Sequence, residues 1–236
     1  MLTLGLDPSL RSYGWVIFDD DGHGSIIDRG HEGTLKTQVP VTRYIHFRSL
    51  VNKLLDRWNV KSVGIESPAY GAGAFSERHF GLMMFSLEAI FNHRKDVILF
   101  DPSTLKFMIR AGLNEKIGAI TKYDVQKYVS LDTMNPKLIN NDESDAYCVA
   151  KFASRFFKLI DGNLDPKQLS SAEMRVFINR TKKSKSNNFL KIKKTAHVFR
   201  ENSRFFKFSK VPPGNVDLPD KAYIDQRLLK FLEHQK

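Results

Sequence analysis

The sequence predicts an α/β fold with one mixed sheet, in which an antiparallel three-strand meander continues into parallel strands flanked by helices. Residues 2–20 have the pattern of a β-hairpin, and a third strand is expected at 25–35 after the acidic turn at 19–22. Residues 41–58 carry apolar side chains at helical spacing, and a short apolar strand follows at 60–65. This strand, helix, strand order favours a parallel crossover, which places the fourth strand beside the first.

The elements after this crossover are predicted by periodicity and capping signals. The segment at 75–93 is apolar on almost every side, as in a buried helix or one at a subunit interface. Ser103 is expected to cap a helix over 104–111 that Gly112 ends. The remaining core elements are a strand at 97–100, a helix from a Thr121 and Asp124 capping box to about 131, and a helix over 142–160.

Charge divides the chain into two parts. Residues 1–160 hold 20 Lys and Arg against 18 Asp and Glu, whereas residues 161–236 hold 17 against 8. We therefore expect a core domain over 1–160 and a basic extension over 161–236. The extension should contain a short helix at 174–178 capped by Ser170 and Glu173, a basic linker at 179–188, a hairpin of strands at 189–199 and 204–211, and a final helix from Asp220.

Composition limits the classes of protein. The formal net charge of +11 favours a polyanionic partner, most often nucleic acid or an acidic membrane surface. The single cysteine, Cys148, excludes a disulfide framework and a thiolate zinc site. We see no membrane span, no signal peptide and no phosphate-binding glycine motif. We therefore expect a soluble protein of the cytoplasm, associated with the nucleoid or, if a phage encodes it, located in the host cytoplasm, and without a membrane partner or small-molecule cofactor.

Four carboxylates are expected to converge at one edge of the sheet. Asp7 ends the first strand on the face opposite the leucines, and Glu66 ends the parallel strand beside it. Asp142 and Asp145 continue the core-facing stripe of the last helix, because they lie four residues before Ala146 and Val149 of its apolar face. Glu143, between them, should face away as a solvated or capping residue.

Carboxylate oxygens suit Mg²⁺, and two such ions can activate a water molecule and stabilise a leaving oxygen in phosphodiester cleavage. Each acid also has a simpler explanation. Asp7 or Glu66 alone is more often a turn residue, and Asp142 and Asp145 alone favour the positive end of the helix dipole. The conjunction of meander, crossover and inward-facing acid pair favours a two-metal nuclease site, with Mn²⁺ as a substitute for Mg²⁺.

Five segments in order resemble the RuvC family of Holliday-junction resolvases, which belong to the ribonuclease H-like superfamily. They are LGLDPSLRSYGWVIFD, VGIESPAYG, DPSTLKFMIRAG, ITKYDVQKYV and NDESDAYCVAKFA, and they span residues 2 to about 160. The resemblance implies a ribonuclease H-like fold and a homodimer that binds a four-way DNA junction and makes paired Mg²⁺-dependent nicks. The family's four acids fall on Asp7, Glu66, Asp142 and Asp145.

The resemblance also implies DNA contacts. Tyr70 is the counterpart of an aromatic used against junction bases, and Lys122 corresponds to a lysine that faces the phosphates, a role that Lys116 could share. The extension lies outside this resemblance. Its basic residues alternate with phenylalanines, a pattern that suits phosphate contacts and, less often, base stacking, although a small packed β-unit with a charged outer face would show it too. There Lys193, Lys194 and Arg204 are the DNA-binding candidates.

Three other functions stay open. One is a related ribonuclease H-like nuclease that acts on other branched DNA or on RNA–DNA hybrids. A second is an actin-like or sugar-kinase ATPase, whose first hairpin also carries an Asp with Gly and Ser, although the chain is short for two lobes. The third is a junction-binding protein that has lost catalysis.

Overall fold

The computed structural model describes residues 1–9, 11–20, 25–35, 37–68, 74–113, 119–133, 140–177 and 196–199. One six-stranded sheet with the order β3-β2-β1-β4-β5-β6 forms its centre. The strands are β1 (Leu2–Asp7), β2 (Ser12–Asp19), β3 (Ser25–Gly33), β4 (Ser62–Glu66), β5 (Asp96–Phe100) and β6 (Ala196–Phe199). The helices are α1 (Pro40–Arg57), α2 (Ala74–Asn92), α3 (Pro102–Leu113), α4 (Lys122–Thr133), α5 (Asn141–Ile160) and α6 (Ser171–Phe177), with a short 3-10 helix at Pro166–Gln168.

The sheet is mixed as expected. β1, β2 and β3 form the antiparallel meander, and β4 pairs with β1 in parallel, as the crossover through α1 requires. β5 continues the parallel part beside β4, and β6 pairs antiparallel with β5 at the edge. The carboxyl ends of β1, β4 and β5 therefore lie at the same edge of the sheet.

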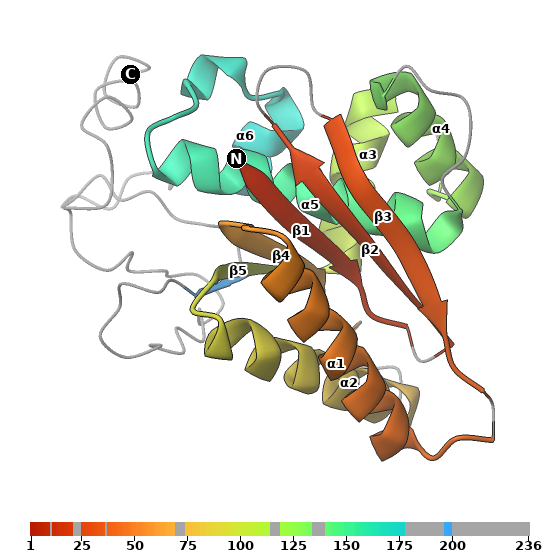
Figure 1. Cartoon of the computed structure of the whole chain (residues 1–236). Coiled ribbons are helices and arrows are strands. Elements are labelled where there is room, and N and C mark those ends of the chain that lie inside the picture. Colours follow the sequence, from red (N-terminus) through yellow and green to blue (C-terminus); the bar gives the residue numbers. More distant parts are fainter. Residues whose placement is uncertain are drawn as a thin grey trace, which may run out of the picture.

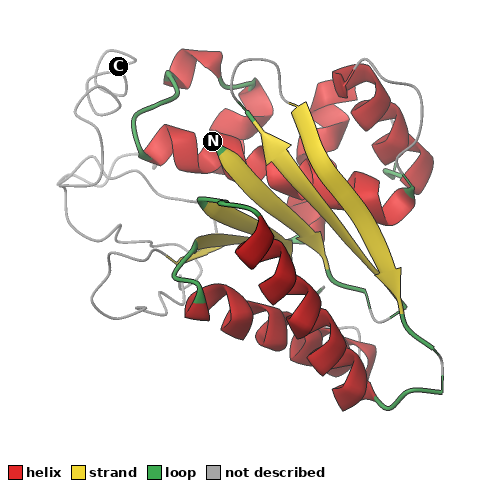
Figure 2. Ribbon diagram, in the orientation of Figure 1, coloured by secondary structure: helices red, strands yellow, loops and turns green. Residues whose placement is uncertain are grey.

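Helices cover both faces of the sheet (Figures 1 and 2). α1 and α2 pack on the face that carries Leu4 and Leu6 of β1. α5 lies across the opposite face, where α3, α4 and α6 surround it in a second apolar core. Since side chains alternate along a strand, Asp7 belongs to the α5 face.

Among the described residues, no helix combines the length and the apolar character that a membrane span needs.

Two glycines let α5 approach the sheet closely. A Cβ atom at Gly5 would lie 2.1 Å from the carbonyl oxygen of Ala146, and one at Gly14 would lie 2.2 Å from that of Asp142. Both obstacles are helix backbone, which cannot move aside as a flexible side chain could. The α5 helix therefore packs on a strip of the sheet at which these two strands carry no side chain.

The capping predictions were right for two helices and wrong for one. Thr121 and Asp124 form the capping box of α4, with Asp124 Oδ2 accepting the Thr121 N–H at 2.8 Å. In α3, however, Ser103 lies inside the helix, and Asp101 accepts its N–H at 2.7 Å. Pro102 at the first position explains the earlier start, because proline needs no amide partner there. Gly112 does not end α3 either; its missing side chain makes room for the ring of Tyr128.

The C-terminal extension contributes three described elements to this fold, the 3-10 helix at Pro166–Gln168, α6 and β6. The capping box of Ser170 and Glu173 is present, but α6 begins at once after Ser170 and not three residues later. The buried Glu173 also forms an ion pair with Arg155 of α5. β6 falls within the strand expected at 189–199. The expected linker at 179–188, strand at 204–211 and final helix from 220 lie outside the described residues, and the two-part division of the chain stays a prediction.

Candidate active site

Asp7 and Glu66 come together because their strands are neighbours in register. Leu6 of β1 pairs with Ile65 of β4, so the next residue of each strand is one of the two acids. Ile65 belongs to the core under α1 and α2, which turns Glu66, like Asp7, toward the α5 face. Both acids are half-buried.

The first turn of α5 brings the second pair of acids to the same place. Asn140 caps this helix, since its Oδ1 accepts the N–H of Glu143 at 2.8 Å. The backbone of Asp142 lies directly over Gly14, which is the cross-strand partner of Asp7. The helical phase that buries Ala146 and Val149 then directs Asp145 toward the same edge, as predicted.

The protonation of the acids reflects their crowding. Burial raises the pKa of Asp7 well above its usual range, and the charges of Glu66, Asp145 and Asp142 raise it further. Burial, followed by the charge of Asp145, raises the pKa of Glu66 to about 8. Burial also raises the pKa of Asp145 to about 6, against the opposing effect of Lys122. The four carboxylates thus act on one another electrostatically and lack enough positive charge to compensate them.

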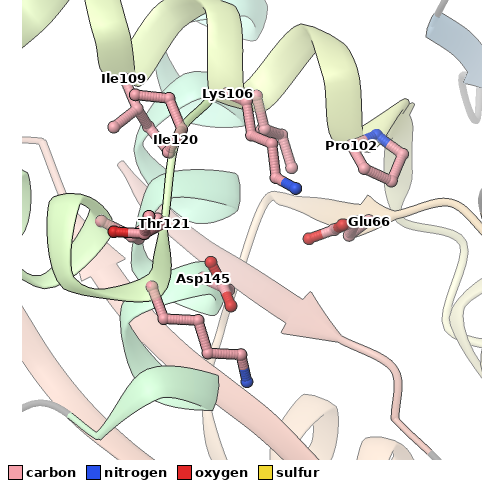
Figure 3. A pocket seen from close by; sticks show the side chains of 10 residues that line it. Glu66, Pro102, Lys106, Ile109, Ile120, Thr121 and Asp145 are labelled. Carbon is pink, nitrogen blue, oxygen red and sulfur yellow. The ribbon is translucent and has the colours of Figure 1, made fainter. Parts of the chain in front are cut away.

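Two lysines stand over this cluster. Glu66 and Asp145 line a cleft of about 240 Å³ between β4, α3, α4 and α5, and Lys106 and Lys122 line it too. In Figure 3 the carboxylates of Glu66 and Asp145 approach each other across the cleft, and the amine of Lys106 extends toward Glu66. Both lysines lower the pKa of Glu66 and of Asp145. The cleft therefore places positive groups beside acids that a phosphate could approach.

The acids converge without forming a closed cage. Among the described residues, no three His, Cys, Asp or Glu side chains already enclose a point where a metal ion could sit. Glu143 does face away from the cluster. Its side chain was expected to be solvated or to cap the helix, but it is mostly buried. Its carboxylate lies against β3, where Arg29 and His31 approach it, and only 12% of the side chain is exposed.

The structure brings the four acids and Lys122 together, while their roles stay a prediction. Tyr70, Lys116, Lys193, Lys194 and Arg204 lie outside the described residues, and their roles stay predictions. Lys106 was missed. Its signal was topological, because α3 begins directly after the carboxyl end of β5, so its first turn has to start at the edge where Glu66 lies.

The fold and the site together define a ribonuclease H-like α/β domain with a carboxylate cluster at the ends of its central strands. No family model matches the chain. The chain is 29% identical over 162 residues to the crossover junction endodeoxyribonuclease RuvC of Orientia tsutsugamushi strain Boryong, and 28% identical over 164 residues to that of strain Ikeda. Each match covers 65% of this chain and 95% of the relative. The expected resemblance to RuvC is confirmed.

Solved structures agree on the fold. Thermus thermophilus RuvC in complex with a Holliday junction substrate superposes with a TM-score of 0.57 at 17% identity, covering 69% of this chain and 98% of that chain. A second T. thermophilus RuvC structure gives a TM-score of 0.53, also at 17% identity, covering 64% and 90%. These likenesses confirm the predicted ribonuclease H-like fold.

Proposed function

We propose that this chain is a structure-selective endodeoxyribonuclease that resolves four-way DNA junctions, acting on DNA in the cytoplasm. The observation that carries the proposal is the meeting of Asp7, Glu66, Asp142 and Asp145 at one sheet edge beside Lys106 and Lys122. The curated relatives are named as crossover junction endodeoxyribonucleases, and one of the structural neighbours was solved with a Holliday junction. Both support this substrate over a generic nucleic acid.

The donor set fits hard divalent cations. Carboxylate oxygens are the ligands that Mg²⁺ prefers, and the raised pKa values mark acids whose negative charge lacks compensation. We propose that Asp7, Glu66, Asp142 and Asp145 would hold two Mg²⁺ ions, for which Mn²⁺ would substitute. When bound, the ions would activate a water molecule for in-line attack and stabilise the oxygen that leaves.

The chain's own residues would then orient the phosphodiester. Lys106 and Lys122 project from two different helices onto the cleft and are placed to hold nonbridging phosphate oxygens. The close contact between α5 and the sheet would hold the four carboxylates in place before the substrate binds. No covalent intermediate with the protein is needed.

The basic extension would add DNA contacts. β6 enters the sheet at Ala196 beside Phe100, and Phe100 is the partner of Glu66 on the other side. β6 therefore begins at the edge of the sheet that carries the acids. We propose that Lys193, Lys194 and Arg204 contact phosphates, together with Lys116, and that Tyr70 contacts a junction base.

Paired nicks need two sites, and an exposed apolar surface supports a homodimer. Two stripes at helical spacing, Val41 with Ile45 on α1 and Phe80 with Met84 on α2, are 39–54% exposed. α1 and α2 pack on each other on the face opposite α5. We call these four residues together the α1–α2 stripe. We propose that a second copy of the chain covers the α1–α2 stripe, which would leave both acid clusters open to DNA.

The decisive test compares the wild type with Asp7→Asn on a synthetic four-way junction in Mg²⁺. The variant keeps the size of the side chain but loses its charge, so we expect junction binding within a few-fold of the wild type and cleavage lowered by at least about 10³-fold. Cleavage at the wild-type rate by the variant would refute the proposed site. A flap and an RNA–DNA hybrid of equal length, tested in parallel, separate junction resolution from the other nuclease activities.

A further inference from the structure

A network of polar side chains connects the first turn of α5 to the neighbouring strand β3. It begins at Asn140, whose side chain serves two elements at once. Its Oδ1 accepts the N–H of Glu143 and caps the helix, while its Nδ2 lies 2.6 Å from His31 Nδ1 on β3. A helix cap requires only the first of these contacts. The second is an additional link between the start of α5 and the sheet.

Glu143 forms the second link, and its Oε2 lies 3.7 Å from Arg29 Nε. Its Oε1 lies 3.3 Å from His31 Nδ1. This nitrogen accepts from Asn140 when it carries no hydrogen and donates to Glu143 when it carries one, so the two contacts of His31 alternate with the tautomer of the ring. Arg29 and His31 are two positions apart on β3 and so project from the same face of the strand. Both reach the one helical turn that carries Asp142 and Asp145.

The register places this network beside the acid cluster. His31 pairs with Gly14 of β2, which in turn pairs with Asp7 of β1. Asp142 lies over Gly14, with the acid cluster on one side and the network on the other. Any rotation or lift of the first turn of α5 would thus move Asp142 and Asp145 relative to Asp7.

The network should add little to the stability of the fold, because two of its side chains are largely exposed to solvent. The side chain of His31 is 51% exposed and that of Arg29 is 34% exposed, and polar pairs at such positions stabilise a fold only weakly. We infer that Arg29, His31 and Asn140, acting in part through Glu143, are positioning residues that fix Asp142 and Asp145 for phosphodiester cleavage. This inference rests on the proposed nuclease function.

The test uses His31→Ala, His31→Gln and Glu143→Ala in the full-length chain. Alanine at position 31 removes the contacts of His31 with Asn140 and with Glu143 and leaves that of Arg29 with Glu143, whereas the amide of glutamine can accept from Asn140 and donate to Glu143 together. A matched control is His46→Ala, because His46 of α1 is 47% exposed and forms an ion pair with the adjacent β3 residue Glu32 at 2.7 Å.

A misplacement near 1 Å lowers rates by about 10²-fold. We therefore expect His31→Ala and Glu143→Ala to lower the cleavage rate at saturating junction by about 10- to 100-fold. Junction affinity and melting temperature should stay close to wild type, His31→Gln should recover most of the rate, and His46→Ala should change nothing. The affinity of the DNA-free protein for Mn²⁺, measured by calorimetry, should fall in the same order.

Equal rates and equal Mn²⁺ affinities for His31→Ala and His46→Ala would overturn the inference and leave the proposed function standing. If the wild type cut no junction, the proposed function would fail instead. The Mn²⁺ affinities would then decide the inference alone, since a network that positions the acids must still affect how they bind a cation, and absence of Mn²⁺ binding by the wild type would overturn it too.

Discussion

Glu66 and Asp145 hold their protons more tightly in the folded chain than in the unfolded one. Burial is the main cause, and it raises the pKa of Glu66 to about 8 and that of Asp145 to about 6. Between the ordinary carboxyl pKa and these values the folded state binds more protons than the unfolded state. Stability of the metal-free protein should therefore decrease as the pH rises from about 5 to 8, and change little above that.

This pH dependence is measurable as melting temperature in EDTA. We expect a fall across the window from pH 5 to 8, and a flatter curve when Mg²⁺ or Mn²⁺ is present, because a bound cation favours the ionised carboxylates. Glu66→Gln should flatten the EDTA curve as well, since it removes the group with the pKa near 8. A melting temperature in EDTA that rises through this window would contradict the electrostatic description.

Asp7 should cost the protein stability while it supports function. Its charge is buried among three other acids, and an uncompensated charge in such a place is destabilising. We expect Asp7→Asn to unfold in EDTA at a higher denaturant concentration than the wild type, at pH 8, by roughly 1–3 kcal/mol. Asp124→Asn is the comparison: its carboxylate caps α4 with two bonds to Thr121, so the same change there should destabilise.

At the scale of elements, the approach of α5 to the sheet decides where two of the four acids lie. Gly14→Ala would place a methyl group against the backbone of Asp142, and α5 would have to shift. We expect a loss of about 1–3 kcal/mol in the free energy of unfolding and a fall in cleavage of at least about 10²-fold. Urea denaturation and junction cleavage measure the two effects.

Gly33→Ala is the matched control for this substitution. Gly33 lies in the same sheet, but a Cβ atom there would meet its nearest neighbour, the Arg11 carbonyl oxygen, at an ordinary 3.5 Å. It should leave stability and cleavage close to wild type. If Gly14→Ala behaved like Gly33→Ala, close packing of α5 would not be what positions Asp142.

The helices and strands could be predicted from the sequence where their pattern is local, and not where it depends on packing between elements. Period-two and helical patterns are local, so the meander, the crossover and the inward stripe of α5 could be predicted, and with them the meeting of Asp7, Glu66, Asp142 and Asp145. Lys106 and the contacts of Glu143 with β3 depend on how separate elements pack, and no local pattern records that. The α3 start was missed because Asp101 and Ser103 are both good caps, and only the backbone path chooses between them.

At the scale of the whole molecule, the uneven charge predicts how DNA binding responds to salt. The +9 excess of residues 161–236 adds to the lysines of the cleft, and each phosphate contact releases counterions. We expect junction affinity to decrease steeply and log-linearly with salt. Replacing Lys193 and Lys194 by Gln should reduce that slope by about 2 while the cleavage rate of bound junction stays unchanged. An unchanged slope would exclude phosphate contacts by these two lysines.

The final prediction concerns assembly. Phe80→Glu with Met84→Glu would place two charges on the α1–α2 stripe, where the wild-type side chains are 52% and 39% exposed. We expect a dimeric wild type and a monomeric variant in sedimentation. Leu131→Glu on α4 is the control, because this residue is 64% exposed but lies on another helix, and this variant should remain dimeric.

Loss of the dimer should change the product and not only the rate. On a supercoiled plasmid with an extruded cruciform, two nicks within one complex give linear DNA, whereas a single nick relaxes the plasmid and removes the junction. The double variant keeps all four acids, so it should give nicked circles where the wild type and Leu131→Glu give linear molecules. Linear product from a variant shown to be monomeric would mean that one chain cuts both strands, and the α1–α2 stripe would then need another partner.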